Sequence, residues 1–141
     1  MKIVIIGDSH NNVSNLKYVM GFAKKIRAGA IIHTGDWNNF DNIKIVSDYA
    51  IPLYSCLGNA DIDPNFKFKE ELEIELDSLK IGICHSIKNC KLKIKNLDVV
   101  FCGHTHKQGQ EKNVINPGAL ENGINFAIFD TKTKGVEFIQ E

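Results

Sequence analysis

Three short apolar runs in the first sixty residues constrain the fold most, because each is followed by a glycine and a polar residue. The runs cover 3–6, 30–33 and 53–57. The first holds four β-branched residues in a row, which is typical of a strand buried on both faces of a sheet. Parallel sheets bind ligands at the carboxyl ends of their strands. The pattern therefore predicts such a sheet, with a site at that edge.

The segments between these runs have helical periodicity. Asn11 and Asn12 are good helix caps, and apolar residues follow at helical spacing over 13–26. We expect Gly29 to end this helix, and a weaker helix over 41–49. A helix between two strands predicts a right-handed crossover, so the first two strands should be parallel neighbours.

The second half of the chain favours further strands. Residues 71–77 alternate strictly between apolar and acidic side chains, which indicates a half-exposed strand. After a turn at Asp77 and Ser78 we expect strands over 79–84, 97–102 and 114–115, and a closing antiparallel hairpin over 125–130 and 136–140. The connection 86–96 has too little room for a long helix.

The composition of the chain argues against several classes of protein. The 141 residues predict one domain, 1–141, and 17 basic against 17 acidic side chains give no broad electrostatic footprint for duplex nucleic acid. The apolar stretches are too short to cross a membrane, and the N terminus lacks the pattern of a secretory signal, so we expect a cytoplasmic protein. Four cysteines without CxxC spacing favour reduced, buried thiols.

Polar residues at five strand ends form a candidate metal site. In an extended chain Asp8 and His10 would point the same way, so both can approach one centre. Imidazole, carboxylate and amide ligands without thiolate suit Mn, Fe, Zn or Ni. Two carboxylates against two divalent ions leave net positive charge, which attracts phosphate even to a neutral protein. The candidates are Asp8, His10, Asp36, Asn59, His85, His104 and His106.

Three nearby residues allow more than one interpretation. His33 lies inside a predicted strand, which favours a core or orienting histidine over a ligand. Trp37 either borders the pocket or packs under a loop. Asp61 either orients a ligand or its loop, or is an ordinary solvated carboxylate.

The motifs, taken in order, resemble the calcineurin-like metallophosphoesterases, particularly their small bacterial and archaeal phosphodiesterase branch. The matching segments are GDSH at 7–10, GDW at 35–37, GNAD at 58–61, His85, GHTH at 103–106 and NPG at 116–118. They span nearly the whole chain. The resemblance implies a four-layer α-β-β-α sandwich of mixed sheets with the helices outside.

The resemblance also implies the chemistry. Asp8, His10 and His106 would hold a first metal ion, and Asn59, His85 and His104 a second, with Asp36 bridging the two. A metal-bridging hydroxide would then attack phosphorus, so these seven residues are also the catalytic set. Manganese is favoured, with Ni, Fe, Zn or Mg as alternatives. Small phosphodiesters are the expected substrates, because no groove for a long polymer is evident.

Two departures from the family pattern bear on function. Ala60 stands where many relatives that hydrolyse phosphomonoesters have a histidine proposed to protonate the leaving group, which tilts the expectation towards diesters. Ser86 and the short connection to residue 96 should expose one side of the site or leave it to a partner subunit of a homo-oligomer. The alternative is a catalytically weak or silent metal-binding scaffold for protein interaction, like the retromer subunit of this fold.

Overall fold

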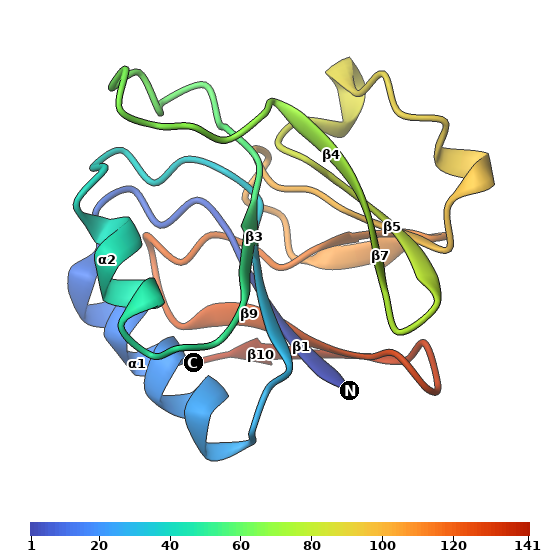
Figure 1. Cartoon of the computed structure of the whole chain (residues 1–141), viewed down its shortest axis with the longest axis horizontal. Helices are drawn as coiled ribbons and strands as arrows, with labels where there is room; N and C mark the ends of the chain where they lie inside the picture. The colour runs from blue at the N-terminus through green and yellow to red at the C-terminus, as the bar shows by residue number, and fades with distance from the viewer.

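Two five-stranded mixed sheets, described over all residues 1–141 in a computed structural model, form the body of the protein (Figure 1). The first sheet contains, in spatial order, β10 (Val136–Gln140), β9 (Asn125–Asp130), β1 (Lys2–Ile6), β2 (Ala30–His33) and β3 (Leu53–Ser55). The second contains β4 (Glu71–Leu76), β5 (Leu79–Cys84), β6 (Val99–Phe101), β8 (Val114–Asn116) and β7 (Gly109–Glu111).

Strand directions follow the predicted pattern. β1 pairs in parallel with β2, and β2 with β3, whereas β9 and β10 form the expected antiparallel hairpin, whose β9 pairs with β1. In the second sheet β5, β6 and β8 are parallel, and β4 and β7 run antiparallel at its two edges. Each sheet therefore contains three neighbouring parallel strands, whose carboxyl ends can deliver polar side chains to a common edge.

The main core lies between the two sheets. Side chains of a strand alternate between faces, so Ile3 and Ile5 of β1 pack with Ile81 and Phe101 of the second sheet. Val4 and Ile6 point the other way into a second cluster. The prediction that β1 is buried on both faces is confirmed, since these four residues of β1 are fully buried.

Two helices cover the outer face of the first sheet, as Figure 1 shows. Helix α1 (Val13–Lys25) contributes Leu16 and Met20 to the second cluster, and α2 (Asn42–Ser47) contributes Val46. Asn12 caps α1, because its side-chain oxygen accepts a hydrogen bond from the Asn15 N–H at 3.0 Å. No helix of the protein is long and apolar enough to cross a membrane.

The outer face of the second sheet is covered by the connection between β5 and β6. This connection holds the 3₁₀ turns η1 (Ile87–Asn89) and η2 (Ile94–Asn96), as its length predicted. Ile87, Leu92 and Ile94 pack there against a small cluster around Leu97 and Val100. The predicted α/β sandwich is thus confirmed, with the fourth layer made of short turns. The four cysteines are free thiols and three are buried.

Among the differences from the prediction, two element ends and one strand have a clear structural reason. Helix α1 ends at Lys25 and not near Gly29, because Arg27 takes a left-handed conformation, with φ of 57°. β3 ends at Ser55, two residues early, because the Leu57 N–H donates to the carbonyl of Lys69 instead of to the sheet. The short polar strand β7 was not predicted.

Candidate metal centre

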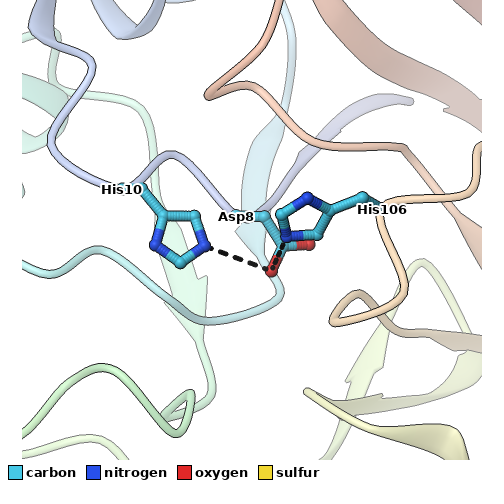
Figure 2. Close-up of side chains that lie close together, drawn as sticks. All are labelled: Asp8, His10 and His106. Atoms are coloured by element: carbon cyan, nitrogen blue, oxygen red, sulfur yellow. Dashed lines mark ion pairs between the residues drawn. The ribbon is translucent and has the colours of Figure 1, made fainter.

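Six of the seven predicted site residues gather in two groups of three. Asp8, His10 and His106 form the first group, and Asp36, His85 and His104 the second. Within each group the candidate ligand atoms lie within 4.8 Å of one another. Figure 2 shows both histidines of the first group turned towards the Asp8 carboxylate, with His106 Nε2 at 3.5 Å and His10 Nε2 at 4.0 Å from Asp8 Oδ1.

The groups draw on both sheets. Asp8 and His10 follow β1 and Asp36 follows β2, whereas His85 follows β5 and the segment 104–106 follows β6. Backbone hydrogen bonds tie these chain segments together: the Asp8 N–H donates to the Gly35 carbonyl, and the Gly103 N–H to the His85 carbonyl, both at 2.9 Å. The site therefore lies where the carboxyl ends of the parallel strands of the two sheets meet.

Left-handed backbone conformations bring the ligand atoms together. Positive φ angles occur at Asp8 (47°), His10 (41°), Asp36 (67°), His104 (72°) and His106 (62°). The expectation that Asp8 and His10 converge is correct, but the extended chain assumed for it is wrong: a tight turn aims both side chains. Each such conformation costs a non-glycine residue about 1 kcal/mol or more, so the surrounding hydrogen bonds must fix it.

Asp36 of the second group also faces the first group. Its Oδ2 atom is 3.4 Å from His10 Nε2 of the first group and 3.2 Å from His85 Nε2 of the second. Its other oxygen, Oδ1, accepts the Ala60 N–H at 2.9 Å. One carboxylate oxygen thus faces both groups, while the other is fixed by the backbone.

Hydrogen bonds set the tautomers of two histidines. Nδ1 of His85 lies 2.8 Å from the Thr34 carbonyl, and Nδ1 of His10 lies 3.0 Å from Asn38 Oδ1. Both partners are acceptors, so Nδ1 carries a proton in each ring, and Nε2 is the nitrogen that faces the carboxylates. Nε2 can bind a cation when it is deprotonated. The donor set therefore fits divalent metal ions.

Asn59 and His104 complete the second side. His104 Nδ1 lies 3.2 Å from His85 Nε2, a separation suited to two ligands of one ion. Asn59 lines a cavity together with these two histidines. The predicted seventh residue thus lies beside the second group.

Asp61 holds the loops that carry Asp36 and Asn59. Its carboxylate is buried and accepts the N–H groups of Asp36 and Gly58 on Oδ2 and of Asn38 on Oδ1, each at 2.9 Å. A Cβ atom at Gly58 would collide with the Asp36 backbone nitrogen. Of the two interpretations of Asp61, the structure supports the one in which it orients the loop.

His33 and Trp37 belong to the core beneath the site. His33 Nδ1 accepts the Gly35 N–H at 3.0 Å, so its Nε2–H donates to Ser9 Oγ at 2.9 Å. Its ring stacks on that of Trp37, whose indole N–H donates to Ser55. Burial lowers the pKa of His33 to about 3, which keeps the imidazole neutral. Both residues therefore support the site from below.

Burial and neighbouring groups shift the pKa values of Asp8, Asp36 and His85 in opposite directions. Burial raises the pKa of Asp8, and the charges of His85 and His106 offset only part of this rise. Burial also acts to raise the pKa of Asp36, but hydrogen bonds from His85 and the Ala60 N–H outweigh it and the pKa is lowered. Burial acts to lower the pKa of His85, but its hydrogen bond to Asp36 raises it. Asp36 is thus the more firmly ionised carboxylate.

One acidic residue at the site was missed by sequence reasoning. Glu121 Oε2 lies 4.0 Å from His10 Nε2, and the Glu121 N–H donates to the Asp8 carbonyl at 3.0 Å. It follows the NPG segment in a loop, five residues beyond the end of β8, so no strand-end signal pointed to it. Thr34 was missed because it acts through its backbone carbonyl, which residue type does not reveal, and Asn38 was missed because it lies in a loop beyond β2.

Known proteins share the sequence pattern and the fold that carry this site. Residues 1–134 match the calcineurin-like phosphoesterase superfamily domain. The chain is 30% identical over 159 residues to the phosphodiesterase MJ0936 of Methanocaldococcus jannaschii, with 95% of each protein covered. The solved structure of an archaeal phosphodiesterase superposes with a TM-score of 0.86 at 27% identity, covering 100% of both chains.

A further solved structure shares the fold at lower identity. A single mutant of Vps29 from Entamoeba histolytica superposes with a TM-score of 0.73 at 18% identity, covering 100% of this chain and 99% of the other. That likeness concerns the fold alone. From the matched domain and the archaeal relative, we conclude that the chain belongs to the calcineurin-like phosphoesterase superfamily.

Proposed function

We propose that the protein is a divalent-metal-dependent phosphodiesterase that hydrolyses small phosphodiesters. The observation that carries this proposal is the position of Asp36, whose Oδ2 atom faces His10 of one group and His85 of the other. A carboxylate shared in this way is suited to a pair of ions and not to one. The phosphodiesterase names of the archaeal relatives support the same reaction class.

The seven predicted residues have distinct roles in this proposal. Bound divalent ions would supply positive charge for the phosphoryl oxygens and lower the pKa of the attacking water. Asp36 is the shared ligand, with Asp8, His10 and His106 on one side and Asn59, His85 and His104 on the other. Manganese is the expected metal, and Ni, Fe, Zn and Mg are alternatives that the same donor set accepts.

The surrounding residues keep this set rigid. Thr34 and Asn38 fix the rings of His85 and His10 through Nδ1, and Asp61 fixes the backbone on either side of the shared carboxylate. Ligands held in one orientation bind a cation without reordering, which strengthens the site. This rigidity is what a substrate phosphate needs to be oriented for in-line displacement.

Diesters are favoured over monoesters by the residue beside Asn59. Ala60 contributes only its backbone N–H, which donates to Asp36, and its methyl group cannot protonate a leaving group. A diester with a good leaving group needs less help from an acid. The chain also carries no net charge to attract a polyanion.

The test is hydrolysis of matched aryl phosphate diester and monoester substrates by metal-stripped protein reloaded with manganese. We expect turnover of the diester, and a loss of at least about 100-fold in kcat for Asp36→Asn. Asp48→Asn is the matched control, because Asp48 lies on the surface in an ion pair with Lys44 and should leave activity unchanged. Two bound ions per chain with no turnover of either ester would instead indicate a metal-binding scaffold, and a monoester preference would contradict the role given to Ala60.

A further inference from the structure

A cavity of about 300 Å³ adjoins the second group of candidate ligands. Asn59, His85 and His104 form the wall that it shares with the site, and Glu70, Glu71 and Asn89 are among the residues on its other sides. Its volume is at the lower end of the range for small-molecule sites. A phosphodiester held at the metal centre would have room there for one of its two alcohol groups.

The lining of this cavity is rich in hydrogen-bond acceptors. Ionised carboxylates only accept, the two asparagines and Ser86 can also accept, and no lysine, arginine, phenylalanine, tyrosine or tryptophan side chain lines the cavity. A second phosphate would find no lysine or arginine there, and the only rings available to a nucleobase are those of the two histidines in the wall shared with the metal site. The group that fits is small and rich in donors.

Glu70 has the carboxylate that is free to meet such a group. It takes part in no hydrogen bond through its side chain and in no ion pair, whereas both oxygens of Glu71 accept the Lys91 N–H, at 3.1 and 2.9 Å. Glu71 therefore holds the 86–96 connection in place while adding negative charge. Glu71 thus fixes the shape of the cavity, and Glu70 is the residue that would contact the bound group.

We propose that this cavity binds an alcohol group that carries a protonated primary amine, so that aminoalkyl phosphodiesters are the preferred substrate class. This proposal rests on the phosphodiesterase function proposed above. An ammonium group offers three donors and a positive charge to the carboxylates, the amide oxygen of Asn89 and the hydroxyl of Ser86. A quaternary ammonium group has no N–H donors and usually needs walls of tryptophan, tyrosine or phenylalanine, which this cavity lacks.

The first arm of the test compares three 4-nitrophenyl phosphodiesters whose second alcohol is 2-aminoethanol, ethylene glycol or propanol. We expect kcat/KM to fall in that order, with the amine about fivefold above the propyl ester, since an exposed charge pair contributes up to about that factor. Glu70→Gln should reduce this preference to about twofold or less. Glu73→Gln is the control, because Glu73 is an exposed glutamate of the same strand region that does not line the cavity.

The second arm does not depend on turnover. Protonated ethanolamine or propanol is titrated into metal-free protein, and the side-chain amide resonances of Asn59 and Asn89 are followed by NMR. We expect saturable shifts with ethanolamine only, lost in Glu70→Gln and kept in Glu73→Gln. Equal kcat/KM for the three esters, or equal shifts with both alcohols, would overturn the inference while leaving the phosphodiesterase proposal intact. Shifts without any turnover would support the cavity and contradict the enzyme.

Discussion

His33 is a neutral imidazole enclosed in the core, and it makes folding stability depend on pH. Its pKa is about 3 in the folded protein against 6.5 for the free side chain. The contribution of neutral His33 to the free energy of unfolding is therefore fully present above pH 6.5. This contribution is lost as the pH falls towards 3, by about 1.4 kcal/mol per pH unit. Between pH 6.5 and pH 5 the loss should be about 2 kcal/mol.

Urea unfolding of metal-free protein at pH 7 and pH 5 tests this dependence. His33→Gln should be less stable than wild type at pH 7, because it loses the stacking on Trp37. Between the two pH values, its free energy of unfolding should nevertheless fall by about 2 kcal/mol less than that of wild type. If wild type and variant lose the same free energy of unfolding on acidification, His33 does not carry the effect.

The candidate ligands could be predicted from sequence, but the residues that orient them could not. Asp8, Asp36 and His85 follow apolar runs that are long enough to identify as strands, and strand ends meet at one edge. Thr34 and Asn38 act through the positions of single oxygen atoms, which depend on the left-handed turns of the folded loops. No periodicity in a sequence encodes such a turn unless glycine marks it.

At the scale of the element, helix α1 ends in a conformation that its sequence disfavours. Arg27 has a φ of 57°, and the two hydrogen bonds of this helix end run from Arg27 N to Lys24 O at 3.1 Å and from Ala28 N to Ala23 O at 2.9 Å. This is the Schellman arrangement, in which glycine is the preferred residue. The exposed Arg27 makes no ion pair that would compensate.

Arg27→Gly should therefore stabilise the protein by about 0.5–1 kcal/mol, because the strain of the left-handed Cβ disappears. Thermal unfolding should show a Tm higher by about 1–4 °C for a chain of this length. Arg27→Ala removes the charge but keeps the Cβ, so it serves as the control. A gain of equal size in both variants would mean that the charge, and not the backbone, was responsible.

Elements were predictable where the hydrophobic pattern was long. The alternating run of β4 specifies a strand and its exposed face, and the run of β1 specifies a strand buried on both faces. β7 has the sequence Gly-Gln-Glu, which carries no apolar signal, and it forms only because β8 offers an edge to pair with. Its existence depends on the tertiary structure and not on local propensity.

At the scale of the whole molecule, the candidate metal centre links the two sheets. Asp8 and His10 extend from the first sheet and His106 from the second, so an ion bound by all three fastens one sheet to the other. An ion that binds the folded chain but not the unfolded chain stabilises the folded state. At an ion concentration of 100 times the dissociation constant, the free energy of unfolding rises by about 2.7 kcal/mol.

Calorimetry with and without manganese checks this linkage. At that excess we expect the Tm to rise by about 5–10 °C over the protein kept in chelator. Asp36→Asn should lose most of the rise, because it removes the ligand that faces both groups. An undiminished rise in that variant would show that the ion binds elsewhere.

The pairing of β1 with β9 has a consequence for biosynthesis. β1 leaves the ribosome more than 100 residues before its antiparallel partner, which spans 125–130. The edge of β1 that β9 covers stays open until those residues have been translated, and the last candidate ligand, His106, also comes late. The nascent chain must therefore keep β1 from wrong partners until residues 125–130 have been translated, and it can complete the candidate metal centre only after His106 has emerged.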